Sequence, residues 1–267
     1  MIEALSQPFM QRAFGAAIVT GLLLPLIGNY LVPKRLSLVG DASSHAAFAV
    51  IALSSLLGFG ATFLTYIAPV AAIYAILQLM RRFHVSGDQA LATLLAVGGA
   101  TASLAISLGA RVNLNAILFG SIILVQFEDI IIGASVAAAV ILFVAGNFGK
   151  TLVYTVSEEL AKVRGVQVET YSLVFAVAAG LSIVTGIKIA GVLLVTALLA
   201  IPTMAASLIS NSFKKSILLS MLFGATATTL GIFMSYFLDI APGAASVMGL
   251  MIFLVFCLVL RSMRIRI

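Results

Sequence analysis

The feature that most constrains this chain is the spacing of its charged residues, which leaves a series of long apolar stretches between them. A helix that crosses the hydrocarbon core of a bilayer needs about 20 mostly apolar residues. Counting between charges predicts nine such spans, at roughly 13–33, 44–58, 61–80, 89–109, 128–148, 170–187, 189–210, 216–238 and 243–260. Merging the weaker stretches would reduce the total to eight. The sequence therefore predicts an all-α, polytopic membrane protein whose single transmembrane domain covers residues 1–267.

Composition excludes the main alternative classes. Hydrophobic residue types make up 62% of the chain and charged types 9%, whereas a soluble domain carries about 25% charged residues. Disorder requires low hydrophobicity and is excluded on the same ground. The single cysteine, Cys257, cannot form a disulfide within the chain and argues against a cysteine-based metal site.

The distribution of Lys and Arg predicts the orientation of the chain. The formal charge of +6 fits basic residues that hold loops on the cytoplasmic side, and we expect no nucleic-acid partner. Alternating the spans leaves only Arg12, Arg111 and Lys188 on the opposite side. This places the amino terminus outside the cell and the carboxy terminus in the cytoplasm. The cytoplasmic side also holds the other 12 basic residues, which are Lys34, Arg35, Arg81, Arg82, Lys150, Lys162, Arg164, Lys214, Lys215, Arg261, Arg264 and Arg266.

Two stretches do not span. Residues 113–126, with Gly120 and Ser121, fit a broken helix that enters the membrane part-way and packs inside protein. The longest polar stretch, about 150–170, is too short for an ATPase or a ligand-binding lobe, and no Walker-type Gly-rich loop is present. If ATP drives transport, another chain must hydrolyse it, so we expect a transport subunit and not an enzyme.

The segment that follows Lys150 predicts a short helix outside the membrane, at about 156–164. Thr155 and Glu158 have the spacing of a capping box, and Glu158 and Lys162 form a favourable i, i+4 pair. Gly165 suits the left-handed position after a helix end. The segment is either a solvated connector or a docking helix that inserts into a groove of a partner, and its apolar residues are Leu160, Ala161 and Val163.

The sharpest candidate site joins the first two spans, where Asp41 and His45 lie four residues apart. If a helix starts near Asp41, both side chains share one face. A carboxylate oxygen and an imidazole nitrogen suit Zn²⁺, and also Mn²⁺ or Fe²⁺. Ser43 and Ser44 could support these ligands through hydrogen bonds.

An alternative interpretation gives this cluster a structural role, with Asp41 as the N-cap of the second span and His45 as a satisfied polar residue in its first turn. Ionisable groups at membrane depth are costly and usually face a cavity or one another. Two ligands bind a metal weakly, which suits a transient site on a transport route.

The other histidine, His84, lies beside a helix start marked by Ser86 and Gln89, and a metal role there is the minor interpretation.

Five strings, taken together and in order over nearly the whole chain, resemble the membrane permease subunits of bacterial ABC importers for zinc, manganese and iron. The second and fourth are quite specific. The family often has Leu where Ser43 stands and Pro where Ala241 stands, which leaves Asp41 and His45 in place. The strings are FMQRA (9–13), KRLSLVGDASSHA (34–46), LFGSI (118–122), KIAGVLLVTALLAIP (188–202) and SYFLDIAPGA (235–244).

The resemblance implies a homodimer with a central pathway in the bacterial cell (inner) membrane, two cytoplasmic ABC ATPase subunits that hydrolyse ATP, and an extracytoplasmic metal-binding protein. Asp41 and His45 would contact the metal in the pathway. No cofactor would be bound permanently, and the transported ion would be zinc, or manganese or iron in an alternative reading; we expect zinc. Residues 156–165 would be the coupling helix on the ATPase, through Glu158, Glu159, Leu160, Lys162, Val163 and Gly165.

The mechanism that this implies is alternating access, in which the docking helix passes movements of the ATPases to the spans. The first rival is an ion-coupled secondary transporter, although paired inverted repeats with interrupted helices are not evident. The second rival is an intramembrane enzyme. With two histidines and no His-Glu-x-x-His motif, the sequence offers little for that chemistry.

Overall fold

The computed structural model of this protein describes residues 7–59, 62–111 and 126–265. Over these residues the ordered elements are helical, and nine of the helices are long and apolar enough to cross a membrane. The elements are α2 (Pro8–Leu31), η1 (Val32–Lys34), α3 (Val39–Leu57), α4 (Thr62–Phe83), α5 (Gly87–Ser107), α7 (Phe127–Gly146), α8 (Phe148–Val156), α9 (Glu158–Val163), α10 (Val168–Ala190), α11 (Val192–Ile209), α12 (Phe213–Leu238) and α13 (Pro242–Ile265).

The predicted all-α membrane fold is confirmed, and each of the nine predicted spans coincides with one long helix. Several helices extend beyond the predicted bounds. Helix α2 begins at Pro8 and α3 at Val39, so that Arg12 and Asp41 are helical. Counting between charges underestimates such helices because a charged residue can still continue a helix beyond the hydrocarbon core. The broken helix predicted at 113–126 falls outside the described residues apart from its last position.

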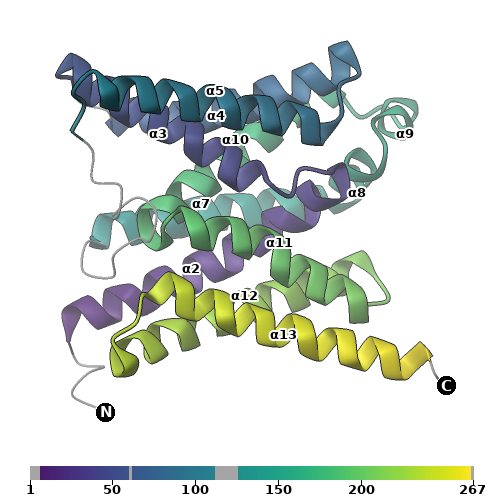
Figure 1. Cartoon of the computed structure of the whole chain (residues 1–267). Coiled ribbons are helices and arrows are strands. Elements are labelled where there is room, and N and C mark those ends of the chain that lie inside the picture. Colours follow the sequence, from purple (N-terminus) through teal and green to yellow (C-terminus); the bar gives the residue numbers. More distant parts are fainter. Residues whose placement is uncertain (1–6, 60–61, 112–125, 266–267) are drawn as a thin grey trace.

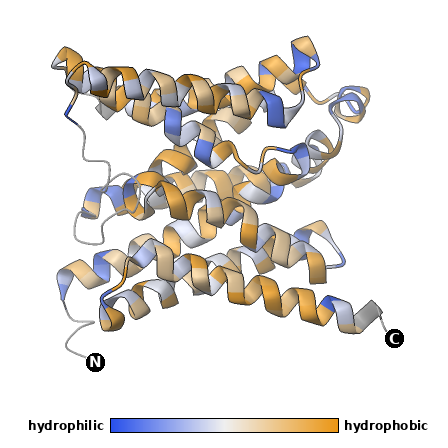
Figure 2. Cartoon of the chain, viewed as in Figure 1, coloured by the Kyte–Doolittle hydropathy of each residue, from blue (hydrophilic) through white to orange (hydrophobic). Residues whose placement is uncertain are grey.

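The helices are arranged in three layers, as Figure 1 shows. Helices α3, α4 and α5 form one layer, α2, α7, α10 and α11 form the middle, and α12 with α13 forms the third. Helix α9 and the last turn of α13 lie at the same end of the bundle, and α2 begins at the opposite end. Hydrophobic residues cover the lengths of the helices, and hydrophilic residues gather at their ends, as expected for a protein surrounded by lipid (Figure 2).

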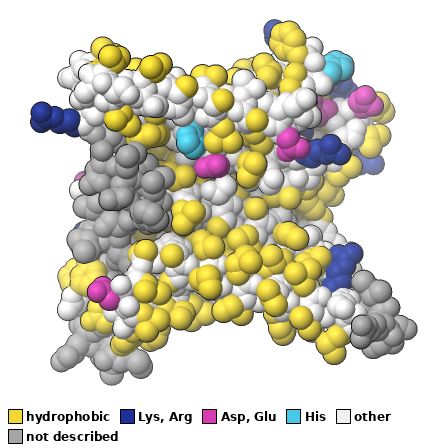
Figure 3. Space-filling view, in the orientation of Figure 1, with side chains coloured by type: hydrophobic (Ala, Val, Ile, Leu, Met, Phe, Trp, Pro, Cys, Tyr) yellow, Lys and Arg dark blue, Asp and Glu magenta, His cyan; other side chains and the backbone are white. Residues whose placement is uncertain are grey.

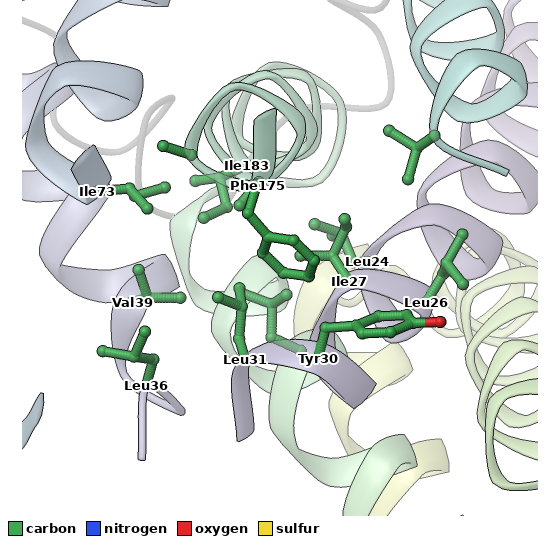
Figure 4. Close-up of a cluster of buried hydrophobic side chains, with 14 of the residues drawn as sticks. Leu24, Leu26, Ile27, Tyr30, Leu31, Leu36, Val39, Ile73, Phe175 and Ile183 are labelled. Carbon is green, nitrogen blue, oxygen red and sulfur yellow. The ribbon is translucent and has the colours of Figure 1, made fainter. Parts of the chain in front are cut away.

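The core forms around α2, which packs against α7, α10 and α11 of the middle layer and against α12 of the third. Tyr30 lies edge-on to Phe175 of α10 and Phe213 of α12, with ring centroids 5.5 and 5.3 Å apart. Around this aromatic centre lie fully buried aliphatic side chains from α2, α3, α4 and α10 (Figure 4). Since α3 carries the candidate site, its start is held against the most buried part of the molecule.

Small residues allow α2 to lie very close to α11 and α12. A methyl group added at Gly28 would collide with the backbone carbonyl of Leu199, and one at Gly224 would collide with the carbonyl of Gly21. Lipid provides little hydrophobic drive between helices, so such close van der Waals contact is a main source of their association. The backbone of α2 is therefore fixed against its neighbours on two sides.

A buried network of hydrogen bonds also joins α2 to α12. The side-chain amide of Asn29 donates to the Ser220 hydroxyl at 2.6 Å and to the Pro25 carbonyl at 2.8 Å. Its carbonyl oxygen accepts from the Ser216 hydroxyl at 3.0 Å. All three side chains are buried. The network thus uses both ends of the amide, and it stabilises a polar cluster inside the bundle.

Candidate functional site

Asp41 and His45 both lie in the first two turns of α3 and point to the same face, as their spacing predicted. Oδ1 of Asp41 is 4.0 Å from Nε2 of His45, and 39% and 40% of the two side chains remain exposed. On the face of the molecule that Figure 3 shows, an acidic side chain and a histidine lie next to each other at the surface. At 4.0 Å the pair is too long for a hydrogen bond, so the oxygen and the nitrogen remain available to a ligand.

The structure does not support the alternative in which Asp41 caps the helix. Helix α3 begins at Val39, its N-cap is Leu38, and no side chain caps it. Asp41 therefore lies inside the first turn. A carboxylate there gains from the helix dipole, and no backbone N–H of the described residues donates to its oxygens.

Nδ1 of His45 is buried and has no hydrogen-bond partner within the described residues. It faces α5, where a methyl group built on Gly99 would lie 3.5 Å from it. On Gly98, a methyl group would lie 2.9 Å from the backbone carbonyl carbon of His45. These two glycines let α3 and α5 touch at the site. Sequence reasoning missed them, although the adjacent pair stands out within the predicted span 89–109.

The two serines predicted to support the site are both buried. The hydroxyl of Ser44 donates to the Gly40 carbonyl at 2.6 Å, within the same helix. The hydroxyl of Ser43 has no hydrogen-bond partner within the part of the chain that the structure describes. Neither serine therefore holds Asp41 or His45 in this structure.

A metal ion at this position would need ligands from elsewhere. Among residues 7–59, 62–111 and 126–265, no group of three or more His, Cys, Asp and Glu side chains could hold a metal. Asp41 and His45 together supply two donors, an oxygen and a nitrogen, a combination that suits divalent transition metals. A second copy of the chain, water or a backbone carbonyl would have to complete the coordination shell.

The predicted short helix outside the spans is present as α9, but its start differs from the prediction. The cap is Ser157, whose hydroxyl accepts from the Leu160 N–H at 3.3 Å. The capping box predicted for Thr155 and Glu158 is wrong, because Thr155 is buried in α8 and donates to the Thr151 carbonyl at 2.8 Å. Gly165 has a φ of 73°, which confirms the predicted left-handed turn after the helix.

Helix α9 and the last residue of α8 present an apolar surface at the end of the bundle. Ala161 is buried beneath it, whereas Val163 is 85% exposed and Leu160 and Val156 are also exposed. Glu159 lies beside them at the surface. In water such a cluster of exposed side chains favours association with a partner.

Glu158 does not form the predicted pair with Lys162 but instead bonds to Lys34, far away in sequence. Nζ of Lys34 donates to Oε1 of Glu158 at 3.0 Å. It also lies 3.7 Å from the ring centre of Tyr154. Burial raises the pKa of Tyr154 to about 12, so the ring stays neutral and its face can hold the ammonium group. Since only 9% of the Lys34 side chain is exposed, this contact firmly joins α9 to η1.

Two other predictions concern residues outside the site. Ser86 and Gln89 form a complete capping box at the start of α5, as their spacing predicted. His84 has a φ of 56° and lies in the preceding turn. Lys188, near the end of α10, has its Nζ 3.9 Å from Asp129 Oδ1 and 4.6 Å from the Tyr66 ring centre.

Comparison with known proteins places this architecture in a family. A model described as the ABC 3 transport family matches residues 6–261. The manganese import system permease protein ScaB of Streptococcus parasanguinis is 32% identical over 257 residues, which cover 94% of this chain and 91% of that protein. The manganese transport system membrane protein MntC of Listeria monocytogenes is 28% identical over 249 residues, which cover 92% of this chain and 89% of that protein.

A solved structure gives the same result. A chain in the structure of PsaBC from Streptococcus pneumoniae in complex with Fab is 32% identical, with a TM-score of 0.82, and the match covers 96% of this chain and 93% of that one. The expected resemblance is confirmed over nearly the full length of the protein. This chain belongs to the ABC 3 transport family and is a multi-pass, metal-ion ABC transporter permease.

Proposed function

We propose that this chain is the permease subunit of an ABC importer that moves Mn²⁺ into the cytoplasm. The observation that carries the proposal is the half-exposed pair of Asp41 and His45, whose Oδ1 and Nε2 atoms lie 4.0 Å apart. One oxygen and one nitrogen donor bind transition metals without the rigid cage that would trap them.

The relatives favour manganese over the zinc that the sequence suggested. Both of those described above carry manganese in their names. Zinc is the less supported substrate on these comparisons, and iron is named by neither relative. A carboxylate in the donor set is well suited to Mn²⁺, since oxygen ligands fit this ion better than sulfur ligands do.

We propose that the site is completed by a second copy of the chain. Two donors from each of two copies would give four ligands around the ion. This arrangement requires the pathway to run between the copies, with an extracytoplasmic binding protein delivering the ion. The predominance of basic residues on one side favours an external amino terminus and a cytoplasmic carboxy terminus.

Helix α9 and the end of α8 form the proposed docking site for the cytoplasmic ATPase, through the exposed side chains of Leu160 and Val163 in α9 and Val156 in α8. The ion pair of Glu158 with Lys34 gives movements of α9 a direct path to η1. Only four residues separate η1 from α3, where Asp41 and His45 lie. Displacement of α9 would thereby change the position of the metal ligands.

Reconstitution into proteoliposomes tests this function. The chain, its ATPase and its binding protein should accumulate radioactive Mn²⁺ only when ATP is present on the ATPase side, and unlabelled Mn²⁺ should compete better than Zn²⁺. A parallel preparation of the chain alone distinguishes the importer from an ion-coupled secondary transporter. Metal uptake by that preparation without ATPase or nucleotide would overturn the proposal.

A further inference from the structure

A cavity of about 330 Å³ lies where η1, α4 and the α8–α9 junction meet. It is separate from Asp41 and His45, which do not line it. The spans Pro8–Lys34 and Phe63–Phe83 end at this cavity, so it lies at the level where lipid headgroups meet the helices. Its lining residues are Pro33, Lys34, Arg35, Leu77, Met80, Arg81, Thr155, Val156, Ser157 and Glu158.

The cavity carries an excess of positive charge. Lys34, Arg35 and Arg81 contribute three cations, and Glu158 is the only acidic residue in its lining. Because Glu158 is paired with Lys34 at 3.0 Å, both arginines remain uncompensated, and neither forms an ion pair within the described residues. The cavity is therefore suited to an anion.

Arg81 has an unused hydrogen-bond donor at this position. Its Nη2 atom is buried and has no hydrogen-bond partner in the part of the chain that the structure describes. Arg81 also lines a second opening of about 610 Å³, together with Lys162. Arg81 thus lines both cavities and has an unpartnered Nη2. A guanidinium group matches the requirements of a phosphate group, which it can bind with two parallel hydrogen bonds.

The remaining walls distinguish a lipid from a free ion. Leu77, Met80, Val156 and Pro33 give the cavity an apolar side. A small inorganic anion would gain nothing from these side chains, whereas a lipid can place its phosphate on the arginines and its glycerol and first methylene groups on the apolar wall. Basic pockets between membrane helices commonly bind anionic headgroups in this way.

We infer that this cavity binds the phosphate of an anionic phospholipid, with Arg81 as its main contact and Arg35 as a second. A lipid bound there would lie against the Lys34–Glu158 ion pair. Its headgroup would thus be placed between α4 and the segment that joins α9 to the metal-binding helix.

The test uses the delipidated full-length chain in detergent, titrated with phosphatidylglycerol or phosphatidylcholine and followed by native mass spectrometry. The wild type should retain phosphatidylglycerol in preference to phosphatidylcholine, and Arg81→Ala should weaken that retention at least about tenfold, the loss expected for one charge-assisted contact. Arg82→Ala is the matched control, since Arg82 is the neighbouring exposed arginine and lines neither opening.

A second variant and a competition with inorganic phosphate complete the experiment. If Arg81→Ala elutes as aggregate, Arg35→Ala should still weaken retention while the protein remains monodisperse. Inorganic phosphate at millimolar concentration should compete poorly, and competition as strong as that of the lipid would overturn the assignment to a lipid. Equal retention of phosphatidylglycerol by the wild type and both variants would overturn the site. These outcomes do not depend on transport, so they are independent of the proposed function.

Discussion

Two polar clusters lie within the helices of this protein, and they are built in opposite ways. Around Asn29, both ends of a buried amide are hydrogen-bonded to neighbours at 2.6–3.0 Å. Around Asp41 and His45, the closest ionic atoms are 4.0 Å apart and the side chains are half exposed, while Nδ1 of His45 has no partner within the described residues. The first arrangement stabilises the bundle, and the second leaves donor atoms free for a substrate.

This difference has a physical basis. A polar group inside a membrane protein is costly unless its hydrogen bonds are satisfied. In a cluster that stabilises packing, we therefore expect every buried polar atom to have a hydrogen-bond partner, as the amide of Asn29 does. In a cluster that must accept and release an ion, the ligand atoms must be free when the ion is absent, because hydrogen bonds within the protein would compete with the ion for the same atoms.

The largest expected loss of stability follows Asn29→Leu. This change removes the acceptor for Ser216 and the amide donor to Pro25 and Ser220, and it should lower the free energy of unfolding by about 2 kcal/mol. The thermal midpoint of the detergent-solubilised protein measures it. Adding Ser216→Ala and Ser220→Ala should recover part of the loss, since no polar partner is then left unpaired; a triple variant no more stable than the single one would contradict this account.

The glycines behind His45 offer a sharper comparison. Gly98→Ala should cost about 1–2 kcal/mol, because its methyl group would press on the His45 backbone at 2.9 Å, and it should also reduce Mn²⁺ uptake by moving the ligand. Gly99→Ala places a methyl group at an ordinary 3.5 Å from Nδ1 and should leave both properties nearly unchanged. Equal effects of the two variants would show that the separation of α3 and α5 does not control the site.

The ion pair between α9 and η1 should have a smaller effect. A double-mutant cycle of Lys34→Met and Glu158→Gln should give a coupling energy of about 1 kcal/mol, since Glu158 is partly exposed to solvent. In the reconstituted transporter each variant should raise the ATP hydrolysed for each ion moved. Glu128→Gln, which changes an exposed carboxylate in the first turn of α7, is the control and should change neither quantity.

Much of this architecture could be predicted from the sequence. Charges at membrane depth are so costly that their spacing alone located the nine long apolar helices found among the described residues. The pair of Asp41 and His45 was also predicted, because residues four apart share a helix face. The helix ends were less predictable, since charged residues such as Asp41 extend a helix past the point where a count between charges stops.

Contacts between residues distant in sequence could not be predicted. Local spacing pairs Glu158 with Lys162, but Lys34 occupies that carboxylate because Tyr154 and the packing of η1 hold its ammonium group nearby. The role of Gly98 likewise depends on α5 lying against α3, which is a property of the assembled bundle. The substrate ion also depends on more than the two ligands in this chain.

Substitutions of Asp41 and His45 should have the smallest effect on stability and the largest effect on transport. Asp41→Ala and His45→Ala should each change the free energy of unfolding by less than about 0.5 kcal/mol. Both side chains are partly exposed, and the 4.0 Å between their ionic atoms is too long for a strong interaction. The most direct test of the central claim is ATP-driven Mn²⁺ uptake by these two variants in proteoliposomes, with their thermal midpoints measured alongside. We predict uptake reduced to background with an unchanged midpoint; wild-type uptake in either variant, or a loss of uptake that only follows a loss of folded protein, would contradict the claim that this pair carries the ion.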